Sequence, residues 1–214
     1  MTVLADGPCS NFRSQFAQHK PKSSSRFWGL QLLDVKLPYQ GYALGVVGRG
    51  PIILIYPISK HETRILIDIP SDTHIALGTT QAVRTYIAVA VVLTLPKAIQ
   101  PALVAALQSG QLRSMPNSWL SSGVQHTRGL LMLGDAWNMR HPLTGAGMTV
   151  ALKDAVLLAE MLRPLSIKDA DAVLKMSKRF YWKRKAHCAA LNILAQALYS
   201  LFTSKGKPCS ILVL

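Results

Sequence analysis

The chain has 214 residues and half of them are hydrophobic, which is enough for one large core or two small ones. Its 24 lysines and arginines against 10 acidic residues give a formal charge of +14, and such a surface favours polyanions, either an anionic membrane or nucleic acid. The three cysteines, Cys9, Cys188 and Cys209, are scattered without metal-ligand spacing, so we expect no metal site, no disulfide framework and a reducing compartment.

The N-terminal residues lack the basic and apolar regions of a secretory signal. The most apolar run, residues 86–96, is shorter than the ~20 residues that a membrane span needs, so we interpret it as a buried helix or strand.

The first half of the chain predicts a sheet. Residues 2–7 look like the end of a buried strand that runs into a turn, and strand-like runs follow at 27–35, 42–48, 51–58 and 63–70. In the last run Ile65, Ile67 and Ile69 alternate with Leu66 and Asp68, which is typical of a half-buried strand. The polar residues 59–62 between two runs suit a hairpin loop, so we expect an antiparallel sheet.

Helices dominate the second half. Residues 80–108 look helical, with interruptions at Pro96 and Pro101. The short apolar run 129–135 indicates a buried strand of a parallel sheet. A well-buried helix is expected from Gly147 to a stop at Pro164, and another helix over 169–203.

The stretch GDAWNMRHPLTGAGM, residues 134–148, places an acid after an apolar strand and a glycine-rich turn before a helix. The N-terminus of a helix has unpaired N–H groups and a positive dipole end, and Gly145 and Gly147 leave room for a close ligand. Asp135 could accept hydrogen bonds from sugar-type hydroxyls, as the ribityl chain of a flavin would require. The alternative is that Asp135 caps a helix and the glycines only form a turn.

The same stretch closely resembles the second FAD motif of the squalene monooxygenase (squalene epoxidase) family. Further segments resemble that family in the same order, which covers nearly the whole chain: VLADGPCSNFR (3–13), FWGLQL (27–32), YPISKHETRILIDIP (56–70), LRSMPNSWL (112–120) and FYWKRK…LNILAQALYSLF (180–202). The match is to the family's C-terminal half. No GxGxxG unit is found, so we expect a truncated chain, and Ala146 stands where the family usually has glycine.

The resemblance implies an α/β (α+β) fold: a partial FAD-binding flavoprotein-monooxygenase fold, an antiparallel-sheet substrate domain and C-terminal helices. The expected domains are the end of the FAD-binding segment with its Asp-Gly motif (1–25), the substrate-domain sheet and helices (26–110), the second FAD motif (111–165) and a membrane-associated helical region (166–214).

The implied activity is FAD-dependent epoxidation of squalene to (S)-2,3-oxidosqualene with O2, in sterol or triterpenoid biosynthesis. Electrons would come from NADPH through NADPH-cytochrome P450 reductase, on the cytosolic face of the endoplasmic reticulum membrane, with monotopic attachment. The resemblance assigns no catalytic side chain, because the cofactor performs the oxidation. The alternative is a truncated, non-catalytic remnant that binds only a membrane or a partner.

By resemblance, FAD is bound by Asp135, Gly145, Gly147, Met148 and Asp6. Squalene would contact Tyr56, Pro142 and Leu143. Simpler interpretations remain for some of these residues: Asp6 could be a turn residue and Tyr56 a core tyrosine. His141 could be a general acid, or a structural histidine that bonds the turn.

Residues 178–202 join a basic, aromatic beginning to an apolar end. The basic residues are Lys178, Arg179, Lys183, Arg184 and Lys185. This helix is either a solvated basic face over a packed apolar face, or an interfacial helix on an anionic membrane. No nucleic-acid-binding module is recognised, so we expect no nucleic-acid partner.

Overall fold

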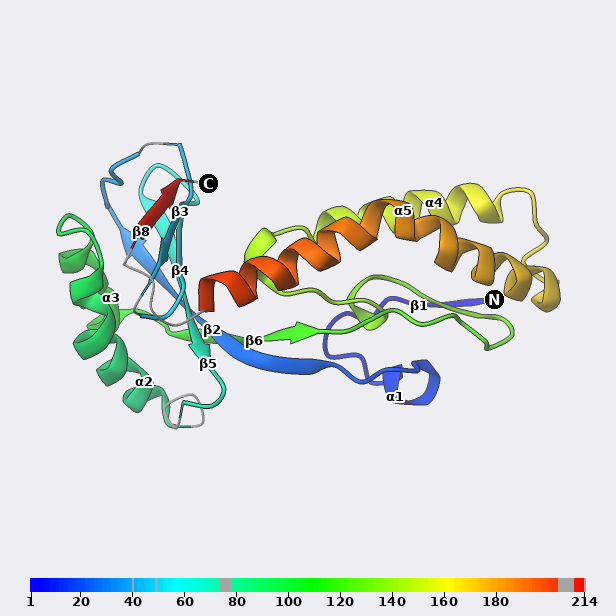
Figure 1. The fold of residues 1–214 in the computed structure, drawn as a ribbon, viewed down its shortest axis with the longest axis horizontal. Coiled ribbons are helices and arrows are strands. Elements are labelled where there is room, and N and C mark those ends of the chain that lie inside the picture. The colour runs from blue at the N-terminus through cyan, green and yellow to red at the C-terminus, as the bar shows by residue number, and fades with distance from the viewer. Residues whose placement is uncertain (40, 49, 74–77, 204–209, 214) are drawn as a thin grey trace. The chain divides into compact units, whose positions relative to one another are not determined.

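The computed structural model describes residues 1–39, 41–48, 50–73, 78–203 and 210–213. Its contacts divide the chain into two compact units, which are described separately (Figure 1). Unit 1 consists of Met1–Lys22 and Ser118–Tyr199, and unit 2 consists of Ser23–Asn117 and Ser200–Leu214. Each unit is therefore built from segments that are far apart in the sequence.

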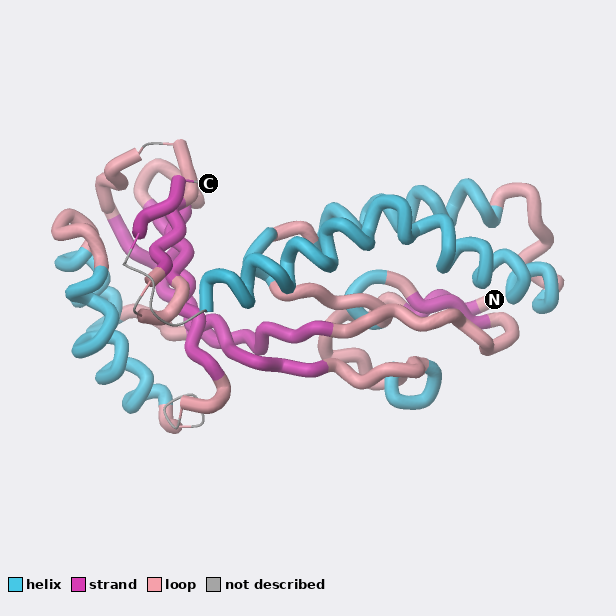
Figure 2. Tube along the Cα trace, viewed as in Figure 1, coloured by secondary structure: helices cyan, strands magenta, loops and turns pink. Residues whose placement is uncertain are grey.

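Unit 2 contains a six-stranded sheet of order β6-β2-β5-β4-β3-β8 (Figures 1 and 2). The strands are β2 (Lys22–Leu33), β3 (Leu44–Val47), β4 (Ile53–Pro57), β5 (Glu62–Pro70), β6 (Arg113–Trp119) and β8 (Ser210–Val213). The pairs β2–β5, β4–β5 and β3–β4 are antiparallel, and β4 and β5 form a hairpin through the loop at 58–61. The four predicted strands and their antiparallel arrangement are confirmed, whereas β6 and β8 were not predicted.

The core of unit 2 lies between this sheet and its helices. Ile65, Ile67 and Ile69 of β5 are completely buried in it, as the alternation predicted. The prediction of a half-buried strand is wrong at Asp68, which is also buried. Its carboxylate accepts a 2.7 Å hydrogen bond from the Asn117 amide, and this bond offsets part of the cost of burying it.

The helices of unit 2 follow β5: α2 (Thr80–Tyr86), the π-helix η2 (Ile87–Val91), the 3-10 helix η3 (Val92–Thr94) and α3 (Gln100–Ser109). The interruption near Pro96 is confirmed, but Pro101 lies in the first turn of α3, where a missing N–H disrupts no helical bond. The run 86–96 is helical. We predicted a buried segment, but one face of this helical run is exposed. Ile87 and Val91 are buried, while Val89 and Leu93 are exposed.

Unit 1 is built on two short parallel strands, β1 (Thr2–Leu4) and β7 (Leu130–Met132), which confirms the predicted parallel strand. Its helical segments are α1 (Arg13–Phe16), η4 (Gly134–Ala136), η5 (Pro142–Thr144), α4 (Gly147–Leu162) and most of α5 (Ala170–Thr203). Side chains of α4 and α5, with Trp137, pack on the strands to form a small apolar core.

Helix α4 ends before Pro164, as predicted, but the prediction that it is well buried is wrong. Only Val150, Asp154 and Leu158 are buried, because α5 and the strand pair cover a single narrow face. Met148, Leu152 and Val156 are exposed on another face.

Candidate functional site

The parallel pair β1–β7 brings two loops of unit 1 to the same end of the strands. One loop follows β1 and contains Asp6 and Gly7, and the other follows β7 and contains Asp135. The buried Arg13 joins them. Its Nη2 donates to the carbonyl oxygens of Gly7 at 2.8 Å and Asp135 at 3.0 Å, and its Nε donates to that of Ala136 at 2.9 Å. Sequence reasoning missed Arg13, although it ends the Asp-Gly motif.

Asp135 lies directly after Gly134, whose φ of 62° requires the left-handed region that favours glycine. The Asp135 side chain is partly buried, and burial raises its pKa, although Arg140 and Arg13 act in the opposite direction. Helix α4 begins at Gly147 after Ala146, with no side-chain cap, so the interpretation of Asp135 as its cap is wrong. A partly desolvated carboxylate of this kind can accept hydrogen bonds from a hydroxylated ligand.

The turn before α4 leaves room for a ligand. Gly145 has φ 62°, and a Cβ placed on Gly145 or Gly147 would meet no atom within 4 Å. Ala146 has φ −80°, an ordinary angle for an alanine, so the methyl group that replaces the family's usual glycine causes no backbone strain. The Cβ positions of Gly145 and Gly147 at the start of α4 therefore face open space, and Met148 beside them is exposed.

Arg140 is buried in unit 1 and forms hydrogen bonds to this turn. Its Nη1 donates to the carbonyl oxygens of Ala146 and Gly147, both at 3.2 Å, and its Nε donates to Asn192 Oδ1 on α5 at 2.7 Å. Its Nη2 donates to Asn138 Oδ1 at 2.9 Å. Burial and the neighbouring Arg184 lower the pKa of Arg140. The turn is thus fixed by a rigid guanidinium, which orients the helix terminus before any ligand arrives.

A buried ion pair connects α4 with α5. Arg184 Nε lies 3.0 Å from both carboxylate oxygens of Asp154, and His187 Nε2 lies 2.8 Å from Asp154 Oδ1. Arg184 Nη2 also donates to Asn138 Oδ1 at 3.1 Å, and its guanidinium stacks on Trp137. The prediction that Arg184 belongs to an outward basic face is wrong, because the side chain is only 1% exposed. Charge alone could not distinguish it from its exposed neighbours.

The remaining predicted residues of unit 1 lie near this turn. Pro142 and Leu143 form η5 and are partly buried just before Gly145. His141 Nδ1 accepts from the Leu143 N–H at 3.3 Å, and its ring stacks on Tyr199, as the structural interpretation of this histidine requires. The exposed Asp6 accepts from the Asn11 N–H at 3.1 Å, so it does form a turn contact.

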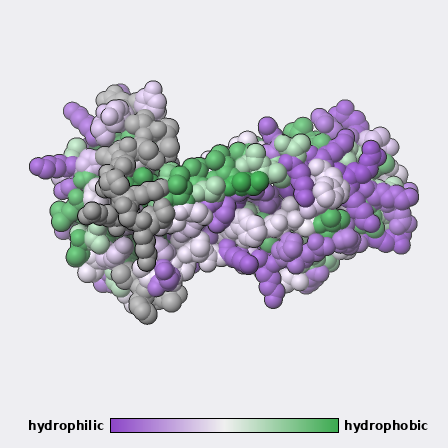
Figure 3. Space-filling view, in the orientation of Figure 1, coloured by the Kyte–Doolittle hydropathy of each residue, from purple (hydrophilic) through white to green (hydrophobic). Residues whose placement is uncertain are grey.

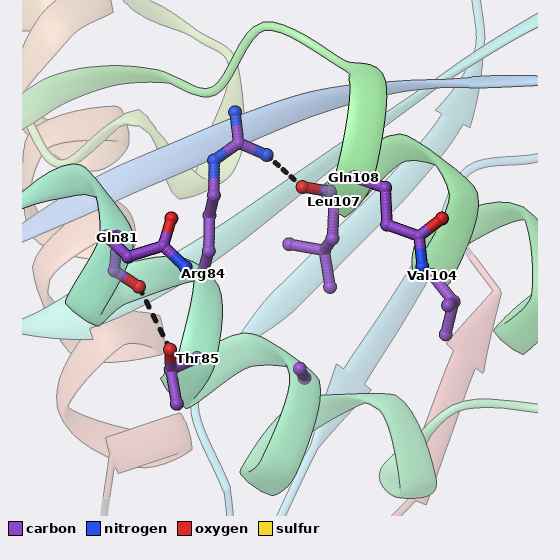
Figure 4. A pocket seen from close by; sticks show the side chains of 7 residues that line it. Gln81, Arg84, Thr85, Val104, Leu107 and Gln108 are labelled. Atoms are coloured by element: carbon purple, nitrogen blue, oxygen red, sulfur yellow. Dashed lines mark hydrogen bonds between the residues drawn. The ribbon is translucent and has the colours of Figure 1, made fainter.

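Tyr56 lies in unit 2, on β4, where it pairs in register with Arg64 and is partly buried. The same unit has a surface pocket between α2 and α3 (Figure 4), lined by Gln81, Thr85, Val104 and Gln108. Arg84 donates there to the carbonyl oxygens of Leu107 and Gly110. These bonds satisfy the C-terminal carbonyls of α3, so we assign Arg84 a structural role.

Cys9 and Cys188 are free thiols, and Cys209 lies outside the described residues. Within the described ranges, no group of three or more His, Cys, Asp or Glu side chains could hold a metal ion. In the same ranges, no helix is both long enough and apolar enough to cross a membrane.

Solved structures of similar fold include proteins described as FAD-dependent or complexed with FAD. A probable FAD-dependent monooxygenase from Pseudomonas aeruginosa, pqsL, matches with a TM-score of 0.68 and 23% identity over 94% of this chain and 55% of that chain. A variant of Klebsiella pneumoniae HpxO complexed with FAD matches with a TM-score of 0.71 and 21% identity over 91% and 50% of the two chains. The fold is therefore that of the FAD-dependent monooxygenases.

The family model for squalene epoxidase matches residues 1–213. Squalene epoxidase erg1 of Aspergillus fumigatus is 49% identical over 97% of this chain and 44% of its own length. Squalene monooxygenase of Mus musculus is 40% identical over 95% of this chain and 35% of its own length. The chain belongs to the squalene epoxidase family, and it spans less than half the length of these relatives.

The site residues fit a flavin. The partly buried Asp135 carboxylate, the uncapped first turn of α4 and the open space at Gly145 and Gly147 all belong to unit 1. The buried Thr144 Oγ1 in the same turn has no hydrogen-bond partner among the described residues. A ligand that presents hydroxyl groups and an electron-rich ring would satisfy these groups.

Proposed function

We propose that this chain provides the second FAD motif and the substrate-domain sheet of a squalene epoxidase. The reaction would convert squalene, O2, two protons and two electrons derived from NADPH to (S)-2,3-oxidosqualene and water, with one oxygen atom going to the terminal alkene and the other to water. The observation that carries the proposal is the uncapped, open start of α4 beside a partly desolvated Asp135. When bound, FAD supplies the oxygen-activating redox chemistry.

In this proposal the residues of unit 1 bind and orient the flavin. With FAD bound, Asp135 would accept a hydrogen bond from a ribityl hydroxyl, and Gly145, Gly147 and Met148 at the positive end of α4 would help to hold the flavin. Arg13 and Arg140 fix the two turns, and Asp6 shapes the loop after β1. His141 is not assigned a proton transfer, because burial lowers its pKa to about 4 and keeps the ring neutral at pH 7.

For squalene, the proposal names Pro142 and Leu143 as contact residues. By the same resemblance, and independently of them, it names Tyr56 on β4. Squalene is a hydrocarbon and partitions into bilayers, so we propose that the enzyme works on the cytosolic face of the endoplasmic reticulum membrane. NADPH-cytochrome P450 reductase is the proposed electron donor.

We propose α5 as the membrane contact. Lys178, Arg179 and Lys183 are exposed, and Lys185 lies over the rings of Tyr181 and Trp182. Figure 3 shows hydrophobic side chains gathered over the C-terminal part of this helix, where Ile193 and Leu194 are exposed, and hydrophilic ones toward its beginning. This distribution matches an interfacial helix with a basic, aromatic beginning and an apolar end.

The test joins the 214 residues to the part of the A. fumigatus relative that lies outside the matched region. With FAD, NADPH, reductase and squalene in detergent micelles, we expect 2,3-oxidosqualene by mass spectrometry, and no product without reductase. A joined chain that retains FAD but forms no epoxide would contradict the proposal. That result would favour the alternative, a non-catalytic remnant of the enzyme.

A further inference from the structure

We propose that the sheet of unit 2 has a binding site for a single phosphate group, between Arg64 on β5 and Arg113 on β6. The site is a cavity of about 130 Å³. The residues that line it are Gly29, Leu30, Gln31, Arg64, Gln111 and Arg113. The inference needs only the sheet of unit 2, so it goes beyond the proposed function and does not depend on it.

Neighbouring strands bring the side chains of this cavity together (Figure 1). Strand β2 lies between β5 and β6, and Gln31 on β2 pairs in register with Arg64 on β5. Tyr56 on β4 pairs with Arg64 in the same way. Residues that pair in register point to the same face of a sheet, whereas Ile65 and Ile67 alternate to the other face and pack in the core. The Arg64 and Gln31 side chains therefore lie on the face opposite that core.

Arg64 has a donor that the described residues leave unused. Its Nε is buried and has no hydrogen-bond partner among them. A buried donor of a charged group is costly to leave unpaired, and folded proteins rarely do so. Neither Arg64 nor Arg113 forms a salt bridge with any described residue. An anion in the cavity would supply both the missing acceptor and the missing negative charge.

The charge of the cavity suits a phosphate. Among the described residues that line it, two are arginines and none is acidic. Glu62 is the nearest acid on β5, two residues before Arg64, and it does not line the cavity. The Arg113 guanidinium is held by Gln111 Oε1, which accepts from its Nε at 3.1 Å and its Nη2 at 2.8 Å. Two guanidinium groups balance a phosphate dianion and can bind its oxygens through paired hydrogen bonds.

The volume limits the ligand to one small group. At roughly 30 Å³ for each water, the cavity has room for about four waters. Sites for drug-sized ligands and cofactors are larger, about 300–1,000 Å³, so a nucleotide or a flavin would not fit. A phosphate group is small enough to enter. It can come from free phosphate or from the headgroup of a phospholipid, and the two sources present the same oxygens.

The first experiment titrates the isotope-labelled 214-residue chain with inorganic phosphate and follows the Arg64 Nε–H signal by NMR. We expect a saturable shift of this signal, because a phosphate oxygen would accept its hydrogen bond. The Nε–H signal of Arg26 should change little. Arg26 lies on β2 outside the cavity, where its Nη2 donates to Ser114 Oγ.

Calorimetry of charge-removing variants tests the same site. Arg64→Met should weaken phosphate binding by at least about tenfold, because it removes charge-assisted hydrogen bonds. Arg113→Met, at an exposed position, should weaken it similarly. Arg26→Met removes the same charge from the same sheet and is the matched control, which should bind as the parent does. Circular dichroism checks folding, and if Arg64→Met does not fold, Arg113→Met and the NMR titration decide.

Arg64→Lys separates charge from geometry. Lysine keeps the positive charge but has no planar fork, so its phosphate affinity should lie between those of the parent and Arg64→Met. Affinity equal to that of the parent would mean that only net charge attracts the anion, and would contradict the site.

Two further ligands identify the occupant. Acetate carries one charge and should bind at least about tenfold more weakly than phosphate. A short-chain phosphatidic acid, kept below its micelle concentration, identifies a lipid headgroup if it binds more tightly than phosphate and free phosphate if it does not; both results support the site. An Arg64 signal that does not move, acetate that binds as tightly as phosphate, or equal losses in Arg64→Met and Arg26→Met would overturn the proposal. No measurement here uses flavin or squalene, so failure of the proposed function would leave these results unchanged.

Discussion

The two units of this chain are held together in different ways. Unit 2 buries an apolar core between a six-stranded sheet and its helices, with three completely buried isoleucines on β5. Unit 1 has two three-residue strands and a small apolar core, and beside that core a buried network of charged and amide side chains around Arg184. The unit with the weaker sheet is the one that carries the candidate flavin site. Polar networks orient groups more strictly than apolar packing does, and a binding site needs that orientation.

The largest effect is expected when one partner of the buried charge network in unit 1 is removed. Arg184→Met leaves the Asp154 carboxylate buried without its main partner, and this should lower the free energy of unfolding of unit 1 by about 3–5 kcal/mol. Amide exchange resolved by unit measures it. Arg179→Met, at an exposed position of the same helix, is the control and should change little.

The double variant Arg184→Met with Asp154→Leu sharpens the test. Replacing both charges by apolar groups should recover much of the lost stability, because no charge then remains unpaired. If the single and double variants are equally unstable, packing and not charge holds α4 and α5 together.

Unit 2 should respond to lost apolar volume. Ile67→Ala creates a cavity in the centre of the sheet and should cost about 2–5 kcal/mol in that unit. Ile58→Ala, at an exposed position after β4, should cost less than about 0.5 kcal/mol. Denaturant titration of both variants gives the values. Equal losses would mean that the core does not control the stability of this unit.

These contrasts also explain what the sequence could predict. The β5 isoleucines and the hairpin loop follow from local patterns, so the antiparallel sheet of unit 2 was predicted. The roles of Arg13, Arg184 and Asn138 were not, because each depends on partners more than 15 residues away in the chain. The exposed apolar face of α4 was missed for the opposite reason: apolar periodicity predicts a buried face, but not what covers it.

The site was accessible to sequence reasoning mainly through the motif at 134–148. Its strand, glycines and helix follow local rules, so the turn at Gly145 and the start of α4 at Gly147 were placed correctly. The joining of the Asp6 and Asp135 loops required the parallel pairing of β1 with β7, and only the structure shows how Arg13 links them.

A pH titration of stability should show an effect of His141 in unit 1. Burial lowers the pKa of His141 in the folded chain to about 4, so the folded state prefers the neutral ring. The stabilisation is complete above the unfolded-state pKa of about 6.5 and is lost as the pH falls toward 4, by about 3 kcal/mol at most. Unit 1 should lose stability in that window, and His141→Gln should flatten the loss. An unchanged slope would show that another group titrates.

The smallest effects concern the proposed membrane contact of α5. Arg179→Glu with Lys183→Glu should weaken sedimentation with vesicles that contain phosphatidylserine, by about 1 kcal/mol or more per charge. Added salt should reduce binding of the parent chain. Lys60→Glu with Lys97→Glu, at exposed positions of unit 2, is the charge-matched control. Equal losses in the two double variants would mean that net charge, and not α5, determines binding.

The central claim is that Asp135 binds the flavin and does not perform the chemistry. The direct measurement is the FAD dissociation constant of Asp135→Ala and Asp135→Asn in the joined enzyme, together with epoxidation at excess FAD. Loss of a charge-assisted hydrogen bond, worth roughly 1.5–3 kcal/mol, predicts about ten- to hundredfold weaker binding for Asp135→Ala. Asp135→Asn keeps one acceptor and should lose less, and excess FAD should restore epoxidation at least partly in both. A variant that holds FAD as tightly as the parent but cannot epoxidise squalene would contradict the account.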